Sequence, residues 1–214
     1  MSNGAETRIL RSRAKIVAAA EDCFLHHGFL GTNMDAIAEQ AGVSKQTVYA
    51  HFGSKEALFI QVVERMTGGA AHEIGEDVED DLKGIPVRDF LLKVAKDQLS
   101  IVLTPRLMRL RRMVIGEVER FPDLGKSLYE NGPARSIDRI ARAIDHYAST
   151  GELRPTEPLR AAAHFNWLVM GGPIGSAMLL GDAGIPGKSD LGVHARECVR
   201  IFLCAFGSEA VSES

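Results

Sequence analysis

Residues 42–58 read GVSKQTVYAHFGSKEAL and form a short segment that is too polar for a protein core. Val43 and Val48 are its apolar anchors, and most of the side chains around them are polar or basic. Ser44 is placed to cap a helix, because a serine side chain accepts a hydrogen bond from a backbone N–H in the first turn. The segment therefore predicts a short helix that buries one side and offers the other to a partner.

A second short helix is predicted just before this segment. Its apolar residues, Met34, Ile37, Ala38 and Ala41, share one face, and Gly42 ends it where the chain needs the conformational freedom of glycine. Two short helices joined by such a turn, with a polar second helix, are typical of the helix-turn-helix, whose second helix enters the DNA major groove. A solvated polar face on an ordinary pair of helices is the alternative.

Two further helices flank this pair. Residues 8–27 have the apolar spacing of an amphipathic helix that stops at Gly28, and Thr32 or Asn33 can cap the helix that follows. Ser54 can cap a fourth helix. The short helices bury little alone, so we expect them to pack on the first helix.

The side chains on the polar helix have the chemistry of DNA recognition. In its first turn, Lys45 suits guanine, Gln46 suits adenine and the Thr47 methyl group suits thymine. Tyr49 and His51 lie further along the helix and suit phosphate contacts.

Two residues near helix N-termini are candidate clamps on the DNA backbone. Thr32 and Lys55 stand at or near the starts of the second and fourth helices, where unpaired N–H groups and the helix dipole favour an anion. Residues 1–55 carry a formal charge of only +1 and the remainder −4, so a basic surface that faces DNA must be local.

Residues 28–59 resemble the DNA-binding domain of the TetR/AcrR family of bacterial transcriptional regulators. The motifs that carry the resemblance are G-F-x-G-T, I-A-x-x-A-G-V-S, T-V-Y-x-H-F and S-K-E-A-L. In the second half, residues 108–133 and 151–169 are similar to the C-terminal domain of the AefR-like branch of that family.

The resemblance implies an all-helical homodimer, usually a repressor, that binds a palindromic double-stranded DNA operator. It also implies release from DNA when a small-molecule effector enters the C-terminal domain. Carried over by position, the DNA surface consists of Thr32, Ser44, Lys45, Gln46, Thr47, Tyr49, His51 and Lys55. Many members of the family have glycine at the position of Gln46, so the base sequence that is read stays open.

Beyond residue 86 the pattern remains helical, and the fold class is all-α. We expect helices over residues 86–103, 105–120, 134–149, 157–180 and 190–206, with a break at Gly132-Pro133 and a stop at Gly151. The predicted domains are a three-helix helix-turn-helix unit over 1–55, a ligand-binding and dimerisation unit over 56–208 and a tail over 209–214.

The last two helices are candidates for a dimer interface, because one short recognition helix reads too few bases for useful specificity. Apolar residues recur on them at helical spacing, although the same stripes can face the chain's own core. The candidates are Phe165, Leu168, Val169, Leu191, Ala195, Cys198, Val199, Phe202 and Phe206.

A ligand cavity is predicted where Gly171-Gly172-Pro173 should kink the penultimate helix or leave carbonyl groups unpaired, because proline lacks an N–H. For any single candidate, core packing is the commoner role. The candidate lining residues are Met108, Met113, Phe121, Tyr129, Phe165, Asn166, Met170 and Met178.

Other classes of protein find little support. The sequence has no nucleophile elbow, zincin motif or zinc spacing, so we expect no enzyme, metal or cofactor. Residues 181–189, GDAGIPGKS, lack the first P-loop glycine and follow a helix. Unpaired cysteines and the absence of a long apolar run favour a cytoplasmic protein without a membrane span. A helical enzyme or a small-molecule-binding protein without DNA readout is the alternative.

Overall fold

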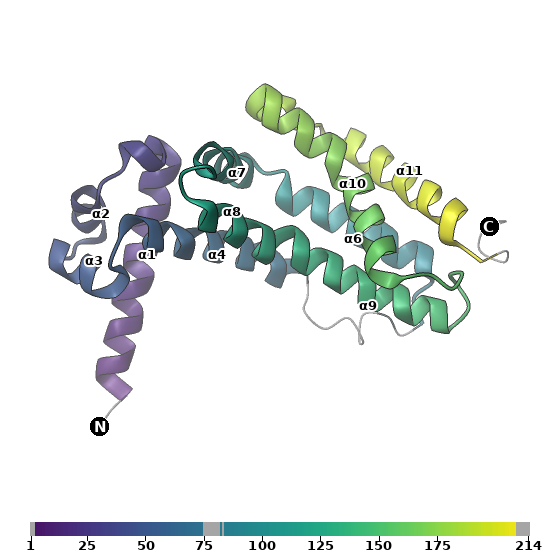
Figure 1. Ribbon diagram of the computed structural model, residues 1–214, viewed down its shortest axis with the longest axis horizontal. Coiled ribbons are helices and arrows are strands. Elements are labelled where there is room, and N and C mark those ends of the chain that lie inside the picture. Colours follow the sequence, from purple (N-terminus) through teal and green to yellow (C-terminus); the bar gives the residue numbers. More distant parts are fainter. Residues whose placement is uncertain (1–2, 75–81, 83, 209–214) are drawn as a thin grey trace. The chain divides into compact units, whose positions relative to one another are not determined.

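The computed structural model describes residues 3–74, 82 and 84–208, which are almost entirely helical (Figure 1). Among them, the only β-type pairing is an isolated bridge between Leu153 and Gly207. The predicted all-α fold is confirmed.

The contacts within the chain divide it into two units. Residues up to 67 group with 109–128, and residues 68–108 group with 129 onward. The domain boundary that we placed at residue 55 stays a prediction, and the predicted tail over 209–214 lies outside the described residues.

The N-terminal unit contains three helices, α1 (Asn3–Gly31), α2 (Met34–Ala41) and α3 (Lys45–Phe52), and the part of α4 (Lys55–Ile74) up to Thr67. Gly28 interrupts the helical backbone of α1 with a φ of 72°, where the sequence predicted a stop. The core of the unit contains the rings of Phe24, Phe29 and Phe59, whose centroids lie 4.7 Å (Phe24 to Phe59) and 5.1 Å (Phe29 to Phe59) apart. Phe24 and Phe29 belong to α1 and Phe59 to α4, so these two helices share an aromatic centre.

Side-chain caps and one glycine set the limits of α2 and α3. The Asn33 side chain accepts from the backbone of Ala36 at 2.8 Å, so Asn33 caps α2. Gly42 ends α2 in the left-handed region with a φ of 68°, which lets the Val43 N–H donate to the Ala38 carbonyl at 3.0 Å. Ser44 then caps α3, and the turn between the two helices is held at both ends.

Helices α7 (Pro105–Glu117) and α8 (Pro122–Tyr129) lie largely within the segment that groups with the N-terminal unit. A π-helical turn, Glu130–Ala134, follows α8 and contains Pro133. The predicted break at Gly132-Pro133 is therefore wrong, because the wider π turn keeps the backbone helical where a proline has no N–H to donate.

The C-terminal unit is built mainly from α6 (Val87–Val102), α9 (Arg135–Ser149), α10 (Pro158–Leu180) and α11 (Lys188–Phe206). Helix α10 packs against α6, α9 and α11, and Figure 1 shows α10 and α11 side by side. The core of the C-terminal unit includes the rings of Phe165 and Phe202, whose centroids lie 5.1 Å apart.

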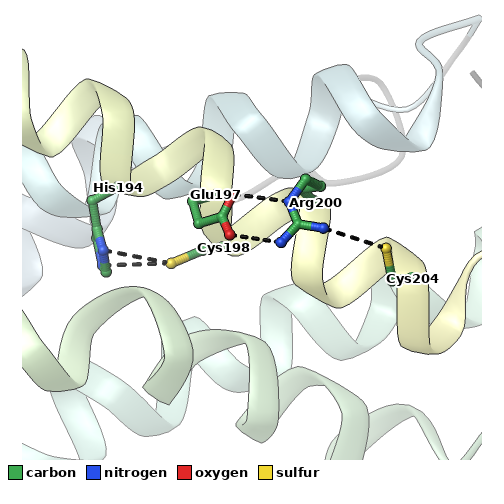
Figure 2. A network of polar contacts seen from close by, with 5 residues as sticks. All are labelled: His194, Glu197, Cys198, Arg200 and Cys204. Carbon is green, nitrogen blue, oxygen red and sulfur yellow. Dashed lines mark hydrogen bonds and ion pairs between the residues drawn. The ribbon is translucent and has the colours of Figure 1, made fainter.

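Pro173 lies inside α10 and leaves a gap in the helical hydrogen bonds, because a proline at this position cannot donate to the Val169 carbonyl four residues earlier. His194 of α11 fills the gap: its Nε2 lies 2.8 Å from the Val169 oxygen. The Cys198 thiol, next to His194 in Figure 2, donates to the neighbouring Leu168 carbonyl at 3.4 Å. The Val169 carbonyl, which the proline leaves without a helical donor, is thus bonded from α11.

A short 3₁₀ turn, Gly181–Gly184, connects α10 with the segment before α11. Gly184 is buried, and a Cβ atom at this position would collide with the backbone oxygen of Ser176 and would lie 2.8 Å from the Leu180 Cβ. Only glycine lets the chain pass this close to α10.

Candidate nucleic-acid interface

Helix α3 has one buried side and one exposed side. Val48 and Phe52 are buried, whereas Lys45, Gln46 and Tyr49 are exposed. This division matches the predicted separation of packing residues from residues that are available to a ligand.

The start of α3 is held rigidly by its cap. The Ser44 Oγ accepts from the backbone N–H of Thr47 at 3.1 Å and lies 2.8 Å from the Thr47 hydroxyl oxygen. Gln46, between these two residues, is exposed and keeps its amide available to an adenine edge.

Lys45 forms an ion pair with Asp35, ten residues earlier on α2. Its Nζ lies 2.8 Å from Oδ1 and 3.0 Å from Oδ2 of Asp35, and 6.0 Å from the centroid of the Tyr49 ring. The hydrogen bond that Lys45 donates to Asp35 raises the pKa of Lys45 above its ordinary value, with the charge of Asp35 acting in the same direction. The predicted base-contacting ammonium is thus held at one place on the exposed surface.

Thr32 and Lys55 make their contacts inside the domain. Thr32 is only 3% exposed, and its hydroxyl lies 2.8 Å from the Gly28 carbonyl oxygen. The Lys55 ammonium donates to the carbonyls of Phe29 and Thr32 at 2.7 and 2.9 Å, and lies 4.4 Å from the Phe29 ring centroid. Both residues therefore tie the end of α1 to the starts of α2 and α4.

His51 lies on the last turn of α3 and is half-buried, with its ring centroid 6.0 Å from that of Phe52. The guanidinium of Arg13 lies 4.9 Å from the Phe52 ring centroid and donates to Gln61, which fixes α1 against the other side of α3. Sequence reasoning missed Arg13 as a support and Asp35 as the partner of Lys45, since no motif links residues so far apart in the chain.

The residues predicted to line a ligand cavity are divided between the two units. Met108, Phe165, Asn166 and Met170 are buried in the C-terminal unit, and Met178 packs against its core. Met113 and Phe121 belong to the segment that groups with the N-terminal unit, where the Phe121 ring lies 5.1 Å from that of Phe29. Tyr129 is exposed.

The residues predicted for the dimer interface belong to the core of their own chain. Six of them are buried and three are partly buried against the same core; the buried ones are Phe165, Val169, Ala195, Cys198, Val199 and Phe202, and the others are Leu168, Leu191 and Phe206. This is the alternative that the apolar spacing left open, because a helical stripe does not reveal whether its partner is the same chain or a second copy.

Helices α10 and α11 also carry apolar side chains on the outside. Trp167 is 45% exposed, Val193 56% and Ile201 41%, and Leu179 and Leu180 at the end of α10 are exposed as well. We call the exposed residues Trp167, Val193 and Ile201 of these two adjacent helices the outer apolar face.

Polar contacts on α11 connect Glu197, Arg200 and Cys204 (Figure 2). The Arg200 guanidinium donates to both carboxylate oxygens of Glu197 at 2.7 and 2.9 Å, and its third nitrogen lies 3.9 Å from the Cys204 sulfur. The hydrogen bond from Arg200 lowers the pKa of Glu197.

Two other kinds of site were sought in the described part of the chain. No group of three or more His, Cys, Asp or Glu residues there is arranged to hold a metal ion. None of the described helices has the length and apolar content that crossing a membrane requires.

Comparison with known proteins identifies both halves of the chain. Residues 16–62 match the family described as bacterial regulatory proteins, tetR family, and residues 89–208 match the AefR-like transcriptional repressor, C-terminal domain. The regulatory protein RaaS of Mycobacterium tuberculosis is 31% identical over 163 residues, which cover 76% of this chain and 69% of RaaS.

Solved structures give the same result. A TetR-family regulator from Mesorhizobium loti is 32% identical with a TM-score of 0.87, and the alignment covers 94% of this chain and 98% of that one. The flavonoid-responsive regulator FrrA is 30% identical with a TM-score of 0.76, covering 93% and 98%. These relatives are regulators and not enzymes, as the sequence predicted. The chain belongs to the TetR family of bacterial transcriptional regulators and has an AefR-like C-terminal domain.

Proposed function

We propose that the protein is a repressor that binds a palindromic operator as a homodimer and leaves it when a small molecule binds the C-terminal unit. The observation that carries the proposal is the exposed polar side of α3, which is held by a capped, glycine-containing turn. A rigid helix with free polar groups is what reading of base edges requires.

Within this proposal the residues of α3 divide into two roles. Lys45, Gln46 and Thr47 contact base edges from the first turn, and Tyr49 and His51 contact phosphates further along. Ser44 holds the first turn in place through its cap, which is supported by its hydrogen bond to the Thr47 backbone.

Thr32 and Lys55 receive a different role from the one that the sequence predicted. Because their polar groups bond to the backbone at the end of α1, we propose that they position the helix-turn-helix instead of clamping phosphates. Loss of either residue would then weaken DNA binding through the geometry of the domain.

The outer apolar face is the proposed dimer interface. Contiguous exposed apolar surface is costly for a soluble protein and marks interaction sites, and a two-fold interface brings the same patch of two chains together. The exposure of Trp167, Val193 and Ile201 on adjacent helices supports this assignment over the buried residues that the sequence favoured.

The proposed effector site lies in the C-terminal unit. Gln98 of α6 is buried, and its Oε1 has no hydrogen-bond partner among the described residues. A buried acceptor of this kind favours a partner that donates a hydrogen bond, and the methionines Met108 and Met170 offer adaptable apolar surface. The solved relative FrrA is described as flavonoid-responsive, which is consistent with a small, polar aromatic effector.

The proposal is tested by measuring binding of the purified protein to DNA from around its own gene, with random duplex as competitor, across a salt series. We expect selective binding with two chains per site and an affinity that falls with salt. Binding no tighter than to random duplex, at the native site and across a genomic library, would favour the alternative of a small-molecule-binding protein without DNA readout.

Two variants of α3 separate base contacts from phosphate contacts. Gln46→Ala should cost about 1–3 kcal/mol of discrimination at one base pair and leave the salt dependence unchanged. Tyr49→Phe should weaken binding to all sequences by a similar factor. If both variants behaved like the unmodified protein, α3 would not be the reading surface.

A further inference from the structure

The ion pair between Asp35 and Lys45 lies on the surface that the proposed function turns toward DNA. Asp35 comes from the first turn of α2, and Lys45 is the first residue of α3. Both side chains are well exposed, and the ammonium lies 2.8 and 3.0 Å from the two carboxylate oxygens. The pair therefore connects the two helices of the helix-turn-helix on its solvent side.

The backbone at Asp35 is fixed at the capped start of α2, whereas Lys45 extends from α3 on a long side chain. Asn33 caps α2 immediately before Asp35, and Met34 and Ile37 on either side of it are buried. Lys45 reaches the carboxylate through a long chain with four rotatable carbons, and the ammonium has three N–H donors. Rotation of the long lysine side chain can open the pair, while the short Asp35 side chain keeps its carboxylate close to α2.

An exposed pair of this kind adds little to stability, because solvent and salt screen it and ordering two side chains costs entropy. The ion pair has a larger effect on the binding of a polyanion such as DNA. While the pair is closed, Lys45 adds no net positive charge to the surface, and the carboxylate repels any phosphate that approaches α2. Non-specific DNA binding depends almost wholly on such charge.

We propose that Asp35 is a specificity-determining residue that keeps Lys45 paired on DNA of the wrong sequence and releases it only to the correct base. This inference rests on the proposed function, since it assumes that α3 meets DNA. A guanine offers the ammonium two acceptors, O6 and N7, in a fixed arrangement, whereas a single phosphate competes with Asp35 on equal terms. Asp35 thus lowers binding to random DNA more than binding to the operator.

The test compares Asp35→Asn with the unmodified protein on operator and on random duplex, each across a salt series. Asparagine keeps the size of the side chain and removes its charge. We expect random-duplex binding to tighten roughly two- to fivefold, the range that an exposed ion pair allows. The plot of log K against log salt on random duplex should become steeper by about 0.9, the slope of one added phosphate contact. Operator binding should change less. The ratio of operator affinity to random-duplex affinity should therefore fall.

Two controls separate the ion pair from a general change of charge. Glu39→Gln removes an exposed acid one turn further along α2 and should leave the affinity ratio unchanged. The double variant D35N/K45Q should lose the gain on random duplex, because Lys45 supplies the released charge. Thermal unfolding of each variant checks that the domain remains folded.

The outcomes distinguish the two proposals. If the unmodified protein shows no selective DNA binding, the proposed function fails. If it binds selectively but D35N leaves the ratio unchanged, or E39Q lowers it equally, then Asp35 has no specific role and this inference is overturned while the proposed function stands.

Discussion

Tyr147 shows how a single buried polar group makes the C-terminal unit sensitive to pH. Its ring is buried and its hydroxyl donates to the Ile85 carbonyl at 2.9 Å. Burial, with the charges of Glu152 and Asp89, raises the pKa of Tyr147 from 10.0 to about 12. The folded state therefore favours the protonated phenol, and the stability that it provides is complete below pH 10 and is lost as the pH rises toward 12.

We expect the free energy of unfolding to fall above pH 10 by about 1.4 kcal/mol per pH unit from this group alone. Tyr147→Phe should cost about 1 kcal/mol at pH 8, through loss of one hydrogen bond, and should flatten the decline at high pH. Urea unfolding at pH 8, 10 and 11 measures both effects. The buried Cys198 thiol, whose pKa is raised to about 11, adds a decline of the same sign in both proteins, so their difference isolates the phenol. Parallel curves for the two proteins would contradict the assignment.

At the scale of elements, α10 and α11 depend on each other through the gap that Pro173 creates. The Val169 carbonyl lacks its helical donor, and the His194 ring N–H supplies one from the neighbouring helix. A buried carbonyl without a hydrogen bond destabilises the fold by more than a formed hydrogen bond stabilises it. The contact from His194 therefore fixes the position of α11 along α10.

The dependence is testable with a double-mutant cycle. His194→Phe should destabilise the protein by about 1–3 kcal/mol, because the Val169 carbonyl is left without a donor. In the P173A background the helix regains its own N–H at this position, so the same histidine change should cost much less. His164→Phe, an exposed histidine on α10, is the matched control and should have little effect. If His194→Phe lowered the free energy of unfolding equally in both backgrounds, the role of His194 would not be to bond the carbonyl that Pro173 leaves without a donor.

Several helix starts in the N-terminal unit could be predicted from the sequence, because local side-chain caps set them. Asn33, Ser44 and Ser54 accept backbone hydrogen bonds at the helix starts where their residue types indicated. The π turn at Pro133 could not be predicted, since whether a Gly-Pro pair breaks a helix depends on what packs around it. The ion pair of Lys45 could not be predicted for a similar reason. Whether Lys45 has a partner depends on how the fold places Asp35 of α2 beside it.

At the scale of the whole molecule, the sequence left open which apolar residues contact a second copy of the chain. Spacing alone selected Phe165, Val199 and Phe202, all of which fill the chain's own core. Burial assigns them there and leaves the outer apolar face for a partner. The chain has a single tryptophan, Trp167, and it lies on that face, so its fluorescence reports directly on the proposed interface.

We expect Trp167 emission to shift to shorter wavelength as the protein concentration rises through the dimer dissociation constant. Val193→Glu should weaken the dimer by placing like charges at the two-fold contact, with sedimentation velocity as the direct measure of mass. Leu30→Glu is the matched control, because it makes the same kind of change at an exposed apolar residue of the N-terminal unit. A monomer at all concentrations, or equal weakening by both variants, would contradict the assigned face.

The close approach at Gly184 limits how this protein can vary over generations. Any codon change that replaces this glycine adds a Cβ atom against the Ser176 backbone, whatever the rest of the side chain is. A lineage that acquired such a change would have to rebuild the end of α10, with its exposed Leu179 and Leu180, at the same time. Heritable variation in this turn is therefore confined to the residues on either side of Gly184.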